Sequence, residues 1–144
     1  MIADLAGTLQ DLEQDEGVVL HAYQDHLGYW TIGTGRLIDG RKGGGISLAE
    51  NDYLLTNDIA SRVTVLLAEY PWFATLDPVR QSAFVQLAFN LGIEGLSKFR
   101  HTLGAAAVGD WYGVAHGLRS SLWFRQVQPD RSSRILRMIL KGHR

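Results

Sequence analysis

A hairpin sequence at residues 15–35, DEGVVLHAYQDHLGYWTIGTG, decides how this chain folds. It places two carboxylates, Glu16 and Asp25, and the hydroxyl of Thr31 around a run of glycines and aromatic residues. Cleavage of an acetal between two sugars needs a proton for the departing oxygen and, in most enzymes, a second carboxylate that acts on water or on the sugar. The stretch is therefore a candidate glycosidase site, with Glu16 and Asp25 as its two carboxyl groups.

These residues also have ordinary structural roles. A glutamate at a helix end is commonly solvated, an aspartate in a hairpin turn commonly bonds its own backbone, and a threonine suits a strand. The neighbouring residues favour a catalytic role over a structural one, because Tyr23 and Trp30 offer aromatic faces on which sugar rings can stack. A carboxyl that donates a proton should also be partly buried, since burial disfavours its charged form.

The hairpin and the segments beside it predict a helix followed by a small sheet lobe. Residues 4–16 carry leucines at three- and four-residue spacing and stop at Gly17, which predicts a helix. Residues 18–37 favour strands, with turn residues at 25–28, and predict a hairpin or a three-stranded sheet. A glycine-rich loop at 40–45 is expected to close this lobe.

The remaining residues predict helices. The sequence Ser47-Leu48-Ala49-Glu50 matches a capping box, so a long helix should begin there and end at Pro71. Asp77 and Pro78 should begin an apolar helix that reaches Gly92, and shorter helices fit 97–106, 110–119 and 129–141. We therefore predict a single α+β domain over 1–144. It has a small antiparallel β lobe at about 17–46 and a helical lobe at about 47–144 that includes the N-terminal helix, with a cleft between the lobes.

The composition narrows the class of protein. The chain has 144 residues, 46% of them hydrophobic and 20% charged, as in ordinary globular domains, and it has no Cys. A disulfide scaffold and thiolate-bound zinc are therefore excluded. Acids near the N-terminus argue against a signal peptide, and no apolar run reaches the roughly 18 residues of a membrane span. Net charge is −8 over residues 1–97 and +7 over 98–144, which can attract an anionic polymer or simply be neutralised within the fold.

The spacing of the three candidate residues identifies a family. Glu16, Asp25 and Thr31, within Ala-Tyr-x-Asp-x-x-Gly-Tyr-Trp-Thr-Ile-Gly-x-Gly, resemble phage lysozymes of the T-even bacteriophage type. Residues 77–83, 89–92 and 121–134 resemble later segments of that family in the same order. The resemblance implies a lysozyme-like fold. It also implies an endolysin that hydrolyses the β-1,4 bond between N-acetylmuramic acid and N-acetylglucosamine in bacterial peptidoglycan and so lyses the host cell.

The resemblance also implies a role for each residue. Glu16 falls on the general acid, Asp25 on the carboxylate that positions or activates the attacking water, and Thr31 on the hydroxyl that helps to hold this water. The family inverts the anomeric centre, which requires room for a water between the two carboxyl groups. Three further residues fall on substrate-cleft positions, although core packing is an equal explanation for the first two: Leu37, Phe89 and Thr102. Two arginines fall beside acids, with Arg131 next to Glu16 and Arg134 paired with Asp15.

The chain departs from the family pattern at two residues and one segment. Arg36 stands where relatives have His, so an ion pair made by that His is absent or replaced. The segment between Arg36 and Ile46 is short, which indicates that a small helix of larger relatives is missing. Gly117 stands where relatives have a polar cleft residue, so the substrate contact on that side is in question.

The resemblance also sets expectations for partners and location. Side chains can perform the proton transfers, so neither a cofactor nor a metal is expected. The expected partner is peptidoglycan and not nucleic acid, and the expected state is a monomer. The protein would wait in the host cytoplasm until a separate pore releases it to the periplasm. The basic segment 131–144 either packs on the core or interacts weakly with an anionic outer membrane.

Three other functions are alternatives to hydrolysis. A lytic transglycosylase uses one glutamate without a water-activating aspartate, so Asp25 and Thr31 argue against it. A non-catalytic peptidoglycan-binding module would have no need to keep all three candidate residues. A zinc amidase would need clustered metal ligands, but the five histidines lack the His-Glu-x-x-His spacing.

Overall fold

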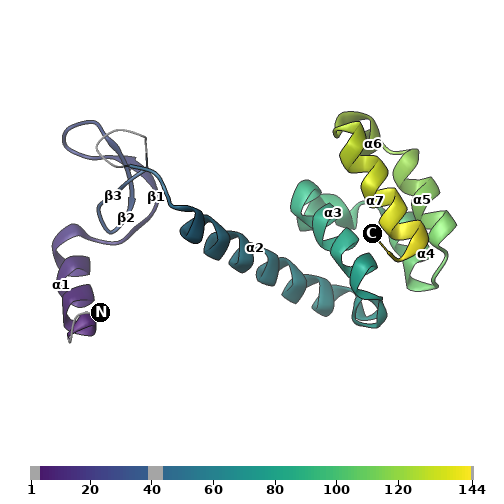
Figure 1. Cartoon of the computed structure of the whole chain (residues 1–144), viewed down its shortest axis with the longest axis horizontal. Coiled ribbons are helices and arrows are strands. Elements are labelled where there is room, and N and C mark those ends of the chain that lie inside the picture. Colours follow the sequence, from purple (N-terminus) through teal and green to yellow (C-terminus); the bar gives the residue numbers. More distant parts are fainter. Residues whose placement is uncertain (1–3, 39–43, 144) are drawn as a thin grey trace. The chain divides into compact units, whose positions relative to one another are not determined.

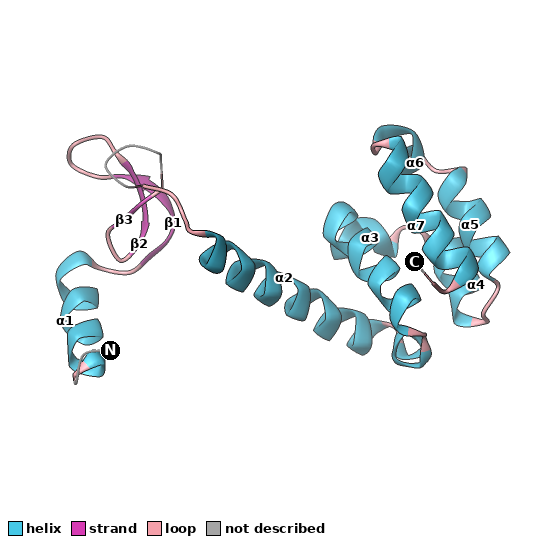
Figure 2. Cartoon of the chain, in the orientation of Figure 1, coloured by secondary structure: helices cyan, strands magenta, loops and turns pink. Residues whose placement is uncertain are grey.

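The chain forms a small mixed unit and a larger helical unit. The computed structural model describes residues 4–38 and 44–143, and it divides into compact units of residues 1–53 and 54–144. Most of the described residues are helical, and a three-stranded antiparallel sheet lies near the N-terminus (Figure 1; Figure 2). The predicted fold class, a small antiparallel sheet with a larger set of helices, is confirmed.

The first unit begins with helix α1 (Leu5–Glu16). The Asp4 side chain accepts a hydrogen bond from the Gly7 N–H at 3.0 Å and caps the start of the helix. At the other end Gly17 has a φ of 74°, and its N–H donates to the Glu13 carbonyl oxygen at 3.0 Å. The predicted stop at Gly17 is confirmed, and it leaves Glu16 as the last helical residue.

A meander of three strands follows α1: β1 (Val19–Gln24), β2 (Trp30–Gly33) and β3 (Arg36–Leu37). Tyr23 pairs with Thr31, and Thr31 pairs with Leu37. Directly opposed residues share a face, so these three side chains form a row across the sheet. The residues at 40–43 of the predicted glycine-rich loop lie outside the described residues.

Helix α2 (Leu48–Glu69) begins in the first unit and continues into the second. Its predicted capping box is confirmed, because the Glu50 N–H donates to Ser47 Oγ at 3.3 Å and the Ser47 N–H donates to Glu50 Oε2 at 2.7 Å. Pro71 lies just beyond its end and opens the short 3₁₀ helix η1 (Pro71–Thr75), as its lack of an N–H requires.

The second unit continues with five helices: α3 (Pro78–Ser97), α4 (Arg100–Ala107), α5 (Trp111–Arg119), α6 (Leu122–Gln126) and α7 (Pro129–Lys141). Asp77 caps α3 as predicted, accepting from the N–H groups of Val79 and Arg80. The predicted break at Gly92 is a kink with a φ of 73°, after which the helix resumes to Ser97. The sequence did not predict α6, whose five residues are too few to show a helical period.

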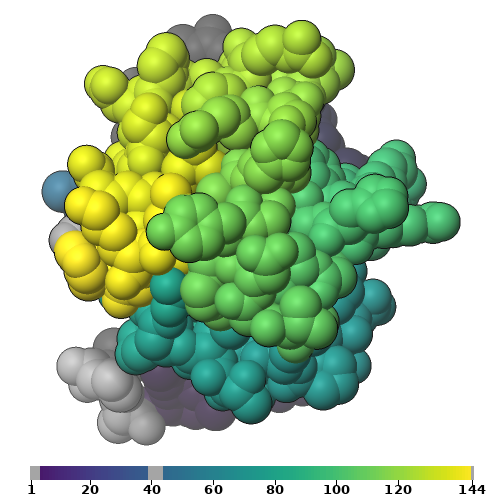
Figure 3. Space-filling model, turned by 90° about the vertical axis from the view of Figure 1, so that its right-hand side faces the viewer, coloured from purple at the N-terminus to yellow at the C-terminus, as the bar shows by residue number. Residues whose placement is uncertain are grey.

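The hydrophobic core belongs to the second unit. Among the described residues, every buried apolar side chain lies between Leu66 and Ile139. Helix α3 contributes five buried apolar side chains to it, and helices α5 and α7 contribute others and pack against each other. Figure 3 shows α7 in yellow beside the green surface of α5. The fully buried side chains include Phe84, Leu87, Leu118, Ile135 and Ile139.

The basic C-terminal helix packs on this core. Ile135 and Ile139 of α7 are buried, whereas Arg134 and Arg137 are exposed. Arg80 of α3 closes the end of α7 by donating from Nε to the Ile139 carbonyl oxygen at 2.8 Å. None of the helices in the described part of the chain has the length and apolar character of a membrane span.

Candidate functional site

Glu16 lies where α1 meets the sheet of the first unit. Its carboxyl group lies against Gly35, the turn residue between β2 and β3, so closely that a Cβ added there would come within 2.8 Å of Glu16 Oε2. Gly35 has a φ of 67°, a conformation that favours glycine on its own account. The turn therefore leaves room for the carboxyl of Glu16. The Glu16 side chain is exposed, so the first unit does not supply the expected partial burial.

Asp25 organises the turn between β1 and β2. Its Oδ1 accepts hydrogen bonds from the N–H groups of Leu27 at 2.9 Å and Tyr29 at 2.8 Å. Asp25 therefore has the structural role that an aspartate commonly has in a hairpin turn. Within the described residues, Oδ2 accepts no hydrogen bond, so one carboxylate oxygen is held by the turn and the other is available.

Thr31 is connected to Asp25 through a single residue. The Thr31 hydroxyl donates to the Tyr29 carbonyl oxygen at 3.1 Å, while the Tyr29 N–H donates to Asp25 Oδ1. The backbone of Tyr29 thus sets the positions of both side chains. Thr31 is only 2% exposed, and its hydroxyl hydrogen is used, so its oxygen retains acceptor capacity.

Two further residues of the first unit extend this group. Leu37 is half-buried on β3 and lies beside Thr31, its strand partner, which agrees with either a substrate contact or packing. Trp30 is 46% exposed and presents an aromatic ring at the surface. The structure therefore places Glu16, Asp25, Thr31 and Leu37 in one small unit.

Arg36 forms an exposed ion pair with Glu50. Its Nη1 lies 2.6 Å from Glu50 Oε1. Hydrogen bonds from the N–H and hydroxyl of Ser47 lower the pKa of Glu50 most strongly. Burial opposes this, and the charge of Arg36, a smaller effect than burial, lowers the pKa further. The partner of Arg36 is the same glutamate that caps α2.

Phe89 lies on α3 in the second unit and is 37% exposed. The guanidinium of Arg62 lies 4.2 Å from the centre of its ring. Phe89 also lines a largely apolar hollow of about 440 Å³, together with Ile59, Val85 and Arg131. The ring is therefore accessible at the edge of a hollow, and its contact with substrate stays a prediction.

Thr102 lies on α4 and is buried, with 4% of its surface exposed. It packs beneath Gly117 of α5, where an added Cβ would collide with Thr102 Oγ1. The glycine at 117 is therefore explained by the close approach of α4 and α5. The hydroxyl of Thr102 lies below the surface of its own unit.

The second unit has another hollow with a polar lining, which the sequence did not predict. It has a volume of about 500 Å³, and Asn90 Oδ1, at its edge, accepts a hydrogen bond from Trp123 Nε1 at 2.6 Å. Amides and a guanidinium recognise sugar hydroxyl and acetamido groups by hydrogen bonds. A cluster of Asn and Gln in segments 90–92 and 126–128 is the signal that was available. Its polar lining residues are Asn90, Gln126, Gln128 and Arg131.

The predicted ion pairs remain predictions. Glu16 and Asp15 belong to the first unit, and their expected partners Arg131 and Arg134 belong to the second. Arg131 is half-buried in the first turn of α7, whereas Arg134 is exposed. Over residues 4–38 and 44–143, no group of three or more His, Asp or Glu side chains is arranged to hold a metal ion.

Known proteins share sequence similarity with most of this chain. The family model described as phage lysozyme matches residues 13–129. The chain is 31% identical to the pre-baseplate central spike protein Gp5 of Enterobacteria phage T4, over 92% of this chain and 27% of that protein. It is 27% identical to probable T4-type lysozyme 1 of Dictyostelium discoideum, over 91% of this chain and 92% of the relative. It is 26% identical to probable T4-type lysozyme 2 of the same organism, over 96% of each chain. The chain thus spans about a quarter of the spike protein and nearly all of the other two.

Proposed function

Because this chain belongs to the phage lysozyme family of glycoside hydrolases, we propose that it cleaves the β-1,4 bond between N-acetylmuramic acid and N-acetylglucosamine in bacterial peptidoglycan. One observation carries the assignment of residues. The backbone of Tyr29 links the side chains of Asp25 and Thr31, in the same unit that places Glu16 against the Gly35 turn.

In the proposed reaction, Asp25 and Thr31 hold the attacking water. The two N–H groups on Asp25 Oδ1 fix the carboxylate, and Oδ2 accepts one hydrogen of the water. Thr31 Oγ1, whose own hydrogen is directed to Tyr29, accepts the other. A water held by both hydrogens directs a lone pair at the anomeric carbon, as attack on the face opposite the leaving group requires.

Glu16 donates the proton to the departing oxygen. Since its side chain is exposed within the first unit, we propose that the bound sugar displaces water from the carboxyl and so favours its protonated form. The exposed ring of Trp30 offers a stacking surface for that sugar. As the water oxygen bonds to the anomeric carbon, Asp25 takes one proton from the water, and the glycosidic bond breaks as its oxygen takes the proton of Glu16. This attack inverts the anomeric centre and releases a reducing end.

The second unit supplies further contacts in this proposal. The polar hollow lined by Asn90 and Gln128 binds sugar hydroxyl and acetamido groups, and Phe89 contacts the glycan. We further propose an endolysin that acts as a monomer on the host cell wall after release from the host cytoplasm through a separate pore. An interaction of the exposed arginines of α7 with an anionic outer membrane is a separate expectation.

Analysis of the digestion products tests the function and its residues together. Purified peptidoglycan is digested with the parent, Glu16→Gln and Asp25→Asn proteins, and the muropeptides are identified by mass spectrometry. The parent should release reducing-end muropeptides, and each variant should lose at least about 100-fold in rate, the usual contribution of an acid or base. Glu13→Gln, an exposed acid of the same helix, is the matched control and should keep the parent rate.

Two results would contradict the proposal. Products that end in anhydromuramic acid would show a lytic transglycosylase instead of a hydrolase. A Glu16→Gln protein that clears cell walls at the parent rate would show that Glu16 is not the acid.

A further inference from the structure

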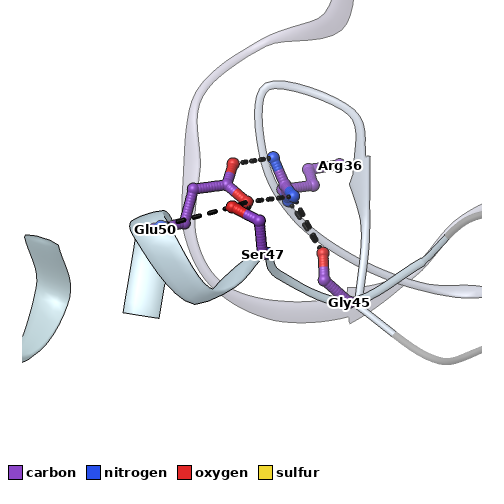
Figure 4. A network of polar contacts seen from close by, with 4 residues as sticks. All are labelled: Arg36, Gly45, Ser47 and Glu50. Carbon is purple, nitrogen blue, oxygen red and sulfur yellow. Dashed lines mark hydrogen bonds and ion pairs between the residues drawn. The ribbon is translucent and has the colours of Figure 1, made fainter. Parts of the chain in front are cut away.

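Arg36 joins three segments of the first unit through a polar network that the proposed chemistry does not use (Figure 4). Its Nη1 and Nη2 donate to Glu50 Oε1 and Oε2 at 2.6 and 2.9 Å, a bidentate ion pair. Its Nε and Nη2 also donate to the Gly45 carbonyl oxygen at 3.1 and 2.9 Å. One guanidinium on β3 therefore holds both the start of α2 and the segment that precedes it.

The glutamate end of this network is already ordered by the helix. Ser47 donates to Glu50 Oε2 from its N–H at 2.7 Å and from its hydroxyl at 2.8 Å. The cap fixes the carboxylate, so pairing with Arg36 costs little further side-chain entropy. The Gly45 N–H also donates to the Leu37 carbonyl oxygen at 3.0 Å, which adds a backbone contact to the same strand.

Strand β3, which is held in this way, and the turn before it provide the residues that lie beside Glu16 and Thr31. Arg36 directly follows Gly35, the turn residue that lies against the Glu16 carboxyl. It directly precedes Leu37, the strand partner of Thr31. A shift of β3 would therefore move the turn beside Glu16 and the neighbour of Thr31 at the same time.

We propose that Arg36 is a positioning residue, which acts through Glu50 and Gly45 to hold β3 and thereby keeps Glu16 and Thr31 in place for hydrolysis. This inference rests on the proposed function. The side chains of Arg36 and Glu50 are 46% and 43% exposed, so their ion pair should add little to global stability. A misplacement of about 1 Å can nevertheless cost about 100-fold in rate. Loss of the network should therefore change turnover more than folding.

The test compares kcat, KM and the melting temperature for Arg36→Met, Glu50→Gln and the double variant, with soluble glycan strands from peptidoglycan as substrate. Glu50→Gln keeps an acceptor oxygen for Ser47, so the helix cap survives while the ion pair is lost. Each single variant should lower kcat by about 10-fold with KM and melting temperature nearly unchanged. The double variant should be no worse than either single one, because both remove the same network.

Two further variants separate positioning from a general loss of charge. Arg36→Lys can pair with Glu50 but cannot reproduce the fork that also reaches Gly45, so it should restore kcat only in part. Glu94→Gln breaks another exposed ion pair, the one with Lys98 at 3.5 Å, and should leave kcat unchanged.

An NMR measurement keeps this test independent of the proposed function. In Arg36→Met, the amide resonance of Gly35 and the carboxyl resonance of Glu16 should shift, whereas both should stay in place in Glu94→Gln. Unshifted resonances would overturn the positioning role even if Glu16 proved not to be the acid. The positioning role of Arg36 would also be overturned by a parent-like kcat in Arg36→Met or by additive effects in the double variant. A fall in kcat that only follows the loss of folded protein would overturn it as well.

Discussion

At the scale of single residues, two glycines with the same backbone conformation have different neighbours. Gly33 and Gly35 both have a φ of 67°. A Cβ at Gly35 would lie 2.8 Å from Glu16 Oε2, whereas a Cβ at Gly33 would meet no atom within 4 Å. The two positions therefore separate the cost of a left-handed backbone from the cost of displacing the Glu16 carboxyl.

Alanine at each of these glycines is a matched pair of experiments. Gly33→Ala and Gly35→Ala should each lower the free energy of unfolding by about 1–2 kcal/mol, the cost of a left-handed conformation for a residue with a Cβ. Only Gly35→Ala should also lower turnover, because its methyl group displaces Glu16. Urea unfolding and the rate of glycan cleavage measure the two effects. Equal losses of turnover in both variants would contradict the role assigned to the Gly35 turn.

The roles of single residues were most predictable from the sequence where those residues belong to a short motif. The spacing of Glu16, Asp25 and Thr31 identified the candidate residues, and it also allowed the structural role that Asp25 has in its turn. The partner of Arg36 was not predictable, because the pair with Glu50 forms only once the sheet meets α2.

At the scale of elements, local capping chemistry made the helix starts predictable. Ser47 with Glu50, and Asp77 with Pro78, satisfy N–H groups within three residues of themselves, so no tertiary contact is needed to recognise them. Helix α6 also has a cap, in which Ser121 accepts from the Phe124 N–H at 3.3 Å. That signal alone did not distinguish a five-residue helix from a turn.

The cap of α3 should contribute more stability than that of α6. Asp77 Oδ1 accepts from two N–H groups, and Oδ2 pairs with Arg80, which reaches the end of α7. Asp77→Ala should therefore lower the free energy of unfolding by about 2 kcal/mol, and Ser121→Ala by about 0.5 kcal/mol. Urea unfolding at neutral pH measures both losses, and equal values would show that the link through Arg80 adds nothing.

The Asp77 cap should also depend on pH. Partial burial raises the pKa of Asp77, but hydrogen bonds and charge from Arg80 together outweigh this and hold the pKa below its ordinary value of 3.8. A lowered pKa in the folded state gives stability that is present above the ordinary pKa and is lost as pH falls through the lowered value. The difference in stability between the parent and Asp77→Ala should therefore be largest near neutral pH and should shrink as the pH falls below 3.8.

At the scale of the whole molecule, the candidate chemistry and the hydrophobic core belong to different units. Glu16, Asp25 and Thr31 lie in residues 1–53, and the buried apolar side chains of the described residues lie in 54–144. The apolar helices of the core were predictable from their spacing. The point where the two units divide falls inside α2, and a continuous helix carries no sequence signal of such a boundary.

Two phenylalanines of α3 should therefore separate stability from substrate binding. Phe84 is fully buried, so Phe84→Ala should lower the free energy of unfolding by about 3–5 kcal/mol and leave KM unchanged at temperatures where the protein stays folded. Phe89 is 37% exposed, so Phe89→Ala should cost no more than about 1 kcal/mol, the value of its contact with Arg62, and should raise KM. Urea unfolding and steady-state kinetics on the same two proteins measure this crossed pattern. If Phe89→Ala left KM unchanged, its ring would be packing and not a substrate contact, and the binding surface of the second unit would have to be sought in the polar hollow beside Asn90.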